Sequence, residues 1–194
     1  PNESDFSIVV KNSSDAPVYS GLLKDWDSSK KVQAGTYTVE ASFGDMDDAG
    51  YDKPYFYGKK EFTVTTNATS NVQIPVALEN CAVKVVATEM FNKYVTSCSV
   101  SIKPLALSAW NVVDLNNPKA FFMEPYGLNV KGEYTTQAQG PQATTSFSKE
   151  YTSFEAKSLY TLTLDAKLVG SSTIQITFND TVLGEVEIKE ELND

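Results

Sequence analysis

The sequence predicts an all-β protein of β-sandwich architecture with at most one short helix. Most of its 194 residues fall into short runs in which apolar and polar side chains alternate, the period of a half-buried strand. Turn residues separate several of these runs, for example in VKGE at 130–133 and FNDT at 178–181. Only one segment has its apolar residues at helical spacing. Many short strands with so little helix are typical of sandwiches.

Four strands are predicted in the first half of the chain. Tyr37, Val39 and Ala41 lie on one face of the second strand, and polar side chains occupy its other face. Pro75 cannot donate a hydrogen bond to a neighbouring strand, so the fourth strand is expected at a sheet edge or with a bulge. The four predicted strands are FSIVVK (6–11), GTYTVEASF (35–43), KEFTVTT (60–66) and NVQIPVAL (71–78).

The second half contains the predicted helix and eight further predicted strands. The helix is EMFNKYVTS at residues 89–97, because Met90, Phe91, Tyr94 and Val95 form one apolar face. The predicted strands are CAVKVVAT (81–88), SCSVSIK (97–103), AFFMEP (120–125), LNVKGEYTTQA (128–138), SFSKEYTSFEA (146–156), LYTLTLDAKLVG (159–170), TIQITFND (173–180) and GEVEIKEEL (184–192).

Residues 78–80 read as a boundary, which predicts one domain at 1–79 and another at 80–194. A short internal similarity supports two related halves. VQAGTYTVEA at 32–41 is similar to FEAKSLYTLTLDA at 154–166, with a Tyr-Thr-aliphatic strand that ends in an acidic residue and Ala.

Composition argues against catalysis and against nucleic acid as a partner. The net charge is -9, whereas phosphate binding needs a basic face. The chain has no His and no Arg, and all sixteen basic residues are Lys. The usual general base and the bidentate anion clamp are therefore missing. We predict a protein that is not an enzyme, with no catalytic residues and no cofactor.

The two cysteines, Cys81 and Cys98, each share a strand face with apolar neighbours. This pattern favours two buried free thiols that pack as small hydrophobic side chains. A cross-strand disulfide is the alternative, and it requires a register that places the two residues opposite each other.

An acidic run supplies a candidate calcium site at Asp45, Asp47, Asp48 and Asp52, since hard cations favour clustered carboxylates. The run does not complete an EF-hand, because Ala49 stands at one ligand position and the last ligand position is also apolar. We favour a solvated acidic loop, and no metal.

Five aromatic residues are candidate ligand or partner residues, namely Tyr51, Tyr55, Phe56, Tyr57 and Trp110. Strand alternation places Tyr55 and Tyr57 on one face and Phe56 on the other, so one face is expected to pack on the sandwich. We favour a structural role over stacking on sugar rings for this group. Trp110, in the irregular stretch LSAWNVVDL, reads more readily as a buried plug than as a ligand platform.

Several segments together resemble a known family. They are VQAGTYTVEASFG (32–44), YDKPYFYGKKEFTVT (51–65), VALENCAVKVV (76–86), FNKYVTSCSVSI (91–102) and AKSLYTLTLDAKL (156–168). In this order they are similar to an uncharacterised family of Bacteroidales surface lipoproteins related to fimbrillin-like adhesins of the major and minor fimbria type. The resemblance covers residues 29–188. It implies two tandem β-sandwich domains of Ig-like or transthyretin-like, fimbrillin type, and no catalytic residues.

The resemblance also implies a place and a role. It implies a signal peptide with a lipobox cysteine upstream of Pro1, a lipid anchor as the only membrane contact, and a position on the cell surface at the outer membrane. The role is that of an adhesin, or of a fimbrial subunit or anchor, whose partners are other surface or fimbrial subunits. Asp180–Thr181–Val182 matches the short O-glycosylation signal that goes with such exported proteins.

Fimbrial members polymerise by strand donation after cleavage behind an Arg, which this sequence lacks. An anchor, a tip subunit and a monomeric lipoprotein therefore all stay open. Residues 6–10 and 185–192 are the candidate exchanged strands, or else simple edge strands guarded by charges. The alternative function is a glycan-binding module of a surface polysaccharide-uptake system, with host or dietary glycans as partners.

Overall fold

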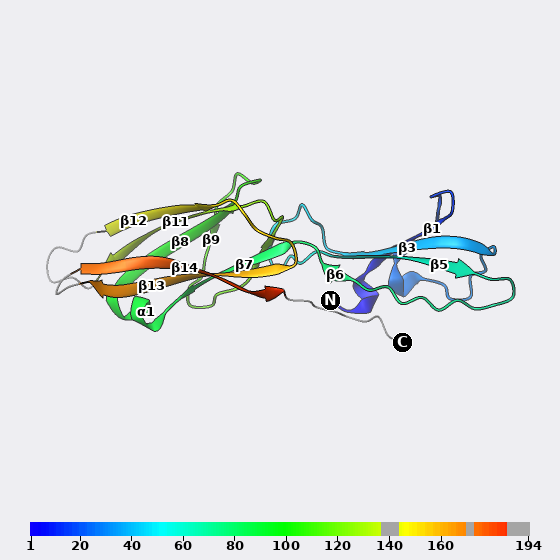
Figure 1. The fold of residues 1–194 in the computed structure, drawn as a ribbon, viewed down its shortest axis with the longest axis horizontal. Helices are drawn as coiled ribbons and strands as arrows, with labels where there is room; N and C mark the ends of the chain where they lie inside the picture. Colours follow the sequence, from blue (N-terminus) through cyan, green and yellow to red (C-terminus); the bar gives the residue numbers. More distant parts are fainter. Residues whose placement is uncertain (137–143, 170–172, 186–194) are drawn as a thin grey trace. The chain divides into compact units, whose positions relative to one another are not determined.

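The computed structural model describes residues 1–136, 144–169 and 173–185, with side chains described as far as Ala166. These residues form three β-sheets and one α-helix, which confirms the prediction of an all-β protein with one short helix (Figure 1). The chain divides into two compact units. Among the described residues, the first contains Pro1–Met46 and Pro54–Glu79, and the second contains Asp47–Lys53 and the chain from Asn80 to Glu185.

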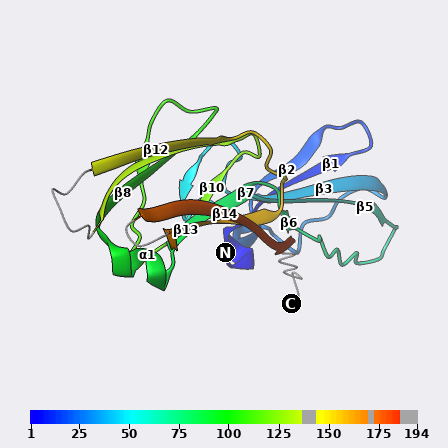
Figure 2. The ribbon, with the colours of Figure 1, turned by 60° about the vertical axis from the view of Figure 1, so that its left-hand side comes forward.

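The first unit holds one five-stranded antiparallel sheet in the order β2-β1-β3-β5-β6, which Figure 2 shows. Alternating apolar side chains fill its core, as the sequence pattern of residues 35–43 predicts. Its elements are η1 (Glu3–Asp5), β1 (Ser7–Asn12), β2 (Pro17–Leu22), η2 (Leu23–Asp25), β3 (Gly35–Phe43), β5 (Phe56–Val64) and β6 (Ala77–Leu78).

Strand β1 lies between β2 and β3, so the interpretation of residues 6–10 as an edge strand is wrong. The sequence did not predict β2, because Pro17 and Gly21 disrupt its alternation. In the structure β2 pairs with β1 through Ile8↔Gly21 and Val10↔Tyr19. The side chains of Ile8 and Val10 are buried.

Only Ala77–Leu78 of the predicted strand at 71–78 is a strand, although Ile74 and Val76 are buried as its alternation predicts. Pro75 explains the difference. Its ring removes a ladder donor, and its carbonyl oxygen lies 2.2 Å from the position of a Cβ on Gly58 of β5. Gly58 therefore allows this non-strand segment to lie directly against the sheet.

The second unit holds two sheets, in the orders β14-β13-β7-β10-β4 and β12-β11-β8-β9. All pairs are antiparallel except β7 with β13, which run parallel. Its elements are β4 (Gly50–Tyr51), β7 (Cys81–Ala87), α1 (Glu89–Tyr94), β8 (Val95–Pro104), β9 (Asn111–Val112), β10 (Phe121–Met123), β11 (Leu128–Thr136), β12 (Thr144–Tyr151), β13 (Ser158–Val169) and β14 (Thr173–Glu185).

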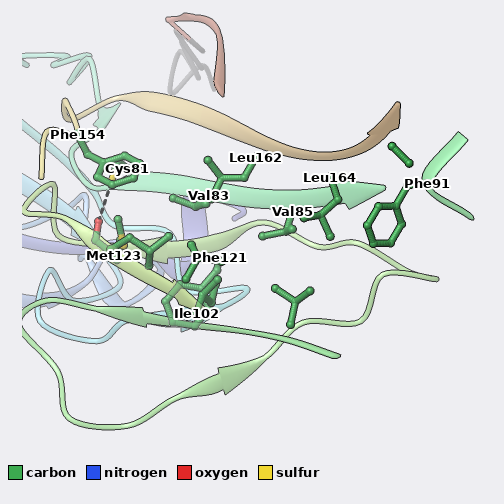
Figure 3. Close-up of a cluster of buried hydrophobic side chains, with 14 residues drawn as sticks. Cys81, Val83, Val85, Phe91, Ile102, Phe121, Met123, Phe154, Leu162 and Leu164 are labelled. Atoms are coloured by element: carbon green, nitrogen blue, oxygen red, sulfur yellow. Dashed lines mark hydrogen bonds between the residues drawn. The ribbon is translucent and has the colours of Figure 1, made fainter. Parts of the chain in front are cut away.

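Both sheets of the second unit contribute buried side chains to one hydrophobic core (Figure 3). Val83 and Leu162 come from the five-stranded sheet, and Ile102 comes from the four-stranded sheet. In the first unit the described residues form a single sheet. Two sandwiches in tandem, divided at residues 79 and 80, therefore stay a prediction.

Helix α1 is connected to the five-stranded sheet at its first turn. The Thr88 hydroxyl accepts a hydrogen bond from the Phe91 amide at 3.1 Å and donates one to Asp165 of β13 at 2.7 Å. Phe91 is buried in the core, whereas Met90 is 41% exposed, so the predicted apolar face of the helix is wrong at Met90. Six residues make less than two turns, and this helix buries one large side chain.

The two predicted turns at 130–133 and 178–181 are wrong, since both lie inside continuous strands. Gly132 of β11 has a packing role instead. A Cβ at this position would lie 2.3 Å from the Ser99 carbonyl oxygen and 2.5 Å from the Phe147 ring. Glycine is required here because two neighbouring strands approach closely, and not because the chain reverses.

Candidate functional site

The aromatic stretch that begins at Gly50 is divided between the two units. Gly50–Tyr51 is β4, the edge strand beside β10 in the second unit. Phe56 begins β5 of the first unit. The four aromatics therefore do not form one platform within either unit.

Tyr51 connects the edges of the two sheets of the second unit. Its ring meets the Phe121 ring edge-on at 5.2 Å, and its hydroxyl donates a hydrogen bond to the Val112 carbonyl oxygen of β9 at 3.0 Å. Burial, and then the nearby Asp114 carboxylate, raise the pKa of the Tyr51 hydroxyl. Both ends of this side chain are engaged within the protein, which favours the structural role.

Phe56 points into the core of the first unit, 4% exposed and 6.4 Å from the Phe6 ring. Tyr55 and Tyr57 are half-buried. The Tyr55 carbonyl oxygen accepts a hydrogen bond from the Glu79 amide at 2.8 Å, and burial raises the pKa of the Tyr55 hydroxyl. Phe56 is thus the packed aromatic of the three.

The acidic run has lysine partners in the second unit. Asp48 pairs with Lys53, and the Asp52 carboxylate lies 4.0 Å from the Lys119 ammonium. Within the described residues, no three side chains of His, Cys, Asp or Glu are grouped as metal ligands. Asp45 and Asp47 fall in different units, which are described separately.

We expect calcium to leave the melting temperature unchanged. A cation bound only by the folded state would raise the melting temperature by mass action, and about 5 mM calcium saturates any site of micromolar affinity. The measurement is a thermal melt in calcium, with magnesium and a chelator as controls. A rise specific to calcium, lost in Asp48→Asn, would contradict this expectation and support the candidate site.

Trp110 differs from the other aromatics because it is 38% exposed, so its interpretation as a buried plug is wrong. It lies in the connection between β8 and β9. The ammonium groups of Lys131 and Lys103 lie 4.1 and 5.5 Å from the centre of its ring. Val112, two residues later, is 74% exposed.

Sequence reasoning missed both lysines. They lie in the separate strands β8 and β11, and only the register brings them together, with Lys131 opposite Ser101 and Lys103 opposite Asn129. The one available signal was that each lysine directly follows a buried strand residue, Ile102 or Val130. Successive side chains of a strand point to opposite faces, so both lysines are expected to face away from the core.

Both thiols are free, as the favoured interpretation of the sequence predicts. Cys81 is buried in β7, where its Sγ lies 3.4 Å from the Met123 carbonyl oxygen (Figure 3). Cys98 lies in the other sheet, opposite Tyr134. The register that a disulfide would require is therefore absent.

These thiols predict a loss of stability in alkali. Burial raises the pKa of the Cys81 thiol to about 12 and that of Cys98 to about 11, from the ordinary 9.0. The folded state keeps both thiols neutral. The stability that they contribute is therefore fully present below pH 9 and is lost as the pH rises toward 11 and 12. We expect the free energy of unfolding to fall more steeply above pH 9 in the wild type than in a C81A/C98A variant.

Denaturant titrations at a series of pH values measure this difference. Parallel pH profiles for the two proteins would show that the thiols do not contribute.

Two further predictions fall on the end of the chain. Residues 186–194 lie outside the described part, and with them most of the candidate exchanged strand at 185–192. The backbone of Thr181 belongs to β14, but its side chain is likewise outside the described part. O-glycosylation at Thr181 stays a prediction.

Within the part of the chain that the structure describes, no helix has the length and apolar character needed to cross a membrane.

The fold is similar to those of solved Bacteroidales proteins. A "fimbrial assembly protein" from Parabacteroides distasonis matches with a TM-score of 0.53 at 10% identity, over 93% of this chain and 91% of that one. A "putative cell adhesion protein" from Bacteroides fragilis matches with a TM-score of 0.51 at 13% identity, over 95% and 87%. At such identities the likeness shows the fold alone. No curated protein sequence matches the chain.

A family match covers the whole sequence, residues 1–194. Together with these fold relatives, it confirms the recognition made from the sequence, a family without a known function that is related in fold to Bacteroidales adhesion and fimbrial proteins. The chain belongs to the family described as Domain of unknown function (DUF4493).

Proposed function

We propose that the chain is a non-catalytic cell-surface protein, an adhesin or a fimbrial subunit or anchor, built from two tandem β-sandwich domains. The observation that carries this proposal is the likeness of fold to a fimbrial assembly protein over more than nine-tenths of both chains. On this proposal a lipid anchor outside these residues holds the protein at the outer membrane, and its loops and strand edges face its partners.

A role without catalysis has support from the side chains. The sequence has no His and no Arg. The tyrosine and cysteine groups with raised pKa owe the shift first to burial. Among them, the Tyr51 hydroxyl and the Cys81 thiol donate hydrogen bonds to backbone carbonyl oxygens. Groups shifted in this way support packing and do not form a nucleophile with its base.

Partners can be reached through strand edges. The described sheets end at β2 and β6, at β14 and β4, and at β12 and β9. β12 has eight residues, and most of its side chains are exposed. An extended segment from another subunit could add to such an edge by main-chain hydrogen bonds. Lys149 and Glu150 on β12 would oppose indiscriminate pairing.

Labelling of intact cells tests the proposal. In the native host, the protein should be accessible to antibody and to added protease on unbroken cells, and should be recovered with the outer membrane. Deletion of the gene should reduce adhesion of the cells or the assembly of their surface fibres. A protein recovered only inside the cells, or a deletion that changes neither property, would count against it.

A second candidate function, a glycan-binding surface module, has one observation in its favour. Trp110 is exposed beside Val112 with two lysines at its ring, and exposed aromatic rings are suited to stacking on sugars. The tyrosines near Gly50 give this function less support, because Tyr51 is engaged within the second unit.

A further inference from the structure

Trp110 lies on the outer face of the four-stranded sheet of the second unit. In the pairing of β9 with β8, Asn111 is opposite the buried Ile102, while Val112 is opposite Ser101 and is 74% exposed. Val112 therefore faces away from the core, and Trp110, two residues earlier, shares its side of the chain. We call Trp110, Val112, Lys103 and Lys131 the Trp110 platform.

Among the residues that the structure describes, the two lysines of the platform have no ion-pair partner. The ion pairs of the described residues involve other lysines, and neither Lys103 nor Lys131 pairs with a described carboxylate. Their observed partner is the indole ring, at 5.5 and 4.1 Å from its centre. In a protein of net charge -9, these two cations gather around one exposed apolar plane.

This combination selects the chemistry of a ligand. An exposed indole ring with two mobile cations over it complements a molecule that has both an apolar face and a negative charge. A pyranose ring that carries a carboxylate has both, since its C–H face stacks on indole and its carboxylate can accept hydrogen bonds from ammonium groups.

Other anions fit less well. An acidic peptide offers carboxylates on flexible chains without a rigid apolar plane, and it would lose side-chain entropy on binding. An extended polyanion such as nucleic acid, or an anionic membrane, would be repelled by the net charge of -9 around two lysines.

We propose that the Trp110 platform binds acidic saccharides of the uronate class, with the sugar ring stacked on Trp110 and the carboxylate held by Lys103 and Lys131. This inference rests on the second candidate function and names the ligand class for it. The present contacts place both ammonium groups over the indole ring, and a sugar stacked on that ring would displace them toward its carboxylate.

The test uses the full chain and trigalacturonate, followed through the indole N–H signals of a ¹⁵N-labelled sample. A W26F variant assigns the signal of Trp110, since the chain has two tryptophans. We expect saturable shifts of the Trp110 signal with a dissociation constant on the order of 1 mM, as befits one small surface site. Binding should weaken with salt, because exposed charges are screened.

Matched probes and variants isolate the two parts of the site. The methyl ester of trigalacturonate keeps the rings and removes the charge, and it should bind at least about fivefold more weakly. Trp110→Ala should weaken binding by more than about tenfold, as loss of a central aromatic does. Lys131→Met should weaken it roughly two- to fivefold and should reduce the preference for the acid over the ester, since Lys103 remains.

Tyr126→Ala is the matched control, because Tyr126 is 66% exposed in the same unit and no described lysine lies over its ring. Binding should be unchanged in this variant. A thermal melt of each variant checks that it is folded, and Trp110→Phe, which keeps a ring, should retain part of the affinity.

Three results would overturn the inference. They are no saturable shift with trigalacturonate or a hyaluronan tetrasaccharide at about 10 mM, equal binding of acid and ester, or tighter binding of hexaglutamate, which would assign the site to acidic polypeptide. None of them bears on surface display or assembly, which the labelling of intact cells tests separately.

Discussion

Phe121→Ala is expected to lower the free energy of unfolding of the second unit by about 3–5 kcal/mol, the usual cost of removing a fully buried phenylalanine. Phe121 is 1% exposed and lies in β10 between β7 and β4. It pairs with Val83 on one side and with Tyr51 on the other. The variant therefore leaves a cavity and also removes the ring contact that supports β4.

Denaturant unfolding followed by tryptophan fluorescence and circular dichroism measures this loss. Because the chain has two compact units, the two probes should be fitted separately. Val112→Ala is the control, since Val112 is 74% exposed in the same unit and should change stability by less than about 0.5 kcal/mol. If Phe121→Ala costs no more than this control, the core described for the second unit is wrong.

Asn80→Leu is expected to destabilise the second unit by about 2–3 kcal/mol, although the side chain keeps its size. Asn80 is fully buried, and its side-chain amide donates a hydrogen bond to the Lys53 carbonyl oxygen at 3.0 Å. The main-chain carbonyl oxygen of Asn80 accepts a hydrogen bond from the Lys157 main-chain amide at 2.9 Å. Asn80 thus connects the segment Asp47–Lys53 to the start of β13. Leucine cannot donate, so the Lys53 carbonyl would lose its partner.

The effect should be greatest in the segment that Asn80 holds. Amide hydrogen exchange in Asp47–Lys53 is expected to become faster in Asn80→Leu, while amides in β8 and β11 keep most of their protection. Asn92→Leu, at an exposed position of α1, serves as the control. If the amides of Asp47–Lys53 exchange as slowly in Asn80→Leu as in the wild type, this hydrogen bond does not fix the segment.

Strands with strong local patterns could be predicted from the sequence. β3 and β13 lie where alternation predicts them, with Tyr37, Val39 and Ala41 buried on one face of β3 and Leu162 and Leu164 buried in β13. α1 also begins at its predicted residue, Glu89. Local periodicity is sufficient here because each strand buries a single face of its own residues.

Elements that depend on a partner could not be predicted in this way. β2 has Pro17 and Gly21 in its short length, and it is a strand because β1 offers it hydrogen bonds. The two residues of β4 carry no pattern of their own. They become a strand because β10 pairs with them and Asn80 holds the segment that follows. Pairing energy outweighs local propensity in both places.

The candidate site shows the same division. The sequence identified Trp110 but could not bring Lys103 and Lys131 to its ring, because that contact depends on the register of β8, β9 and β11. It grouped Tyr51 with Phe56 by proximity along the chain, and the structure assigns the two residues to different units.

By itself, the sequence determined the all-β class, the lack of His and Arg chemistry, the acidic charge and the burial of alternate side chains, because composition and period-2 patterning are properties of the chain alone. Only the tertiary structure decided that residues 50–51 complete a sheet of the second unit and that Phe56 is core. It also decided that Trp110 is exposed with two lysine ammonium groups over its ring. Each of these depends on contacts between residues distant in sequence, and strand register sets those contacts.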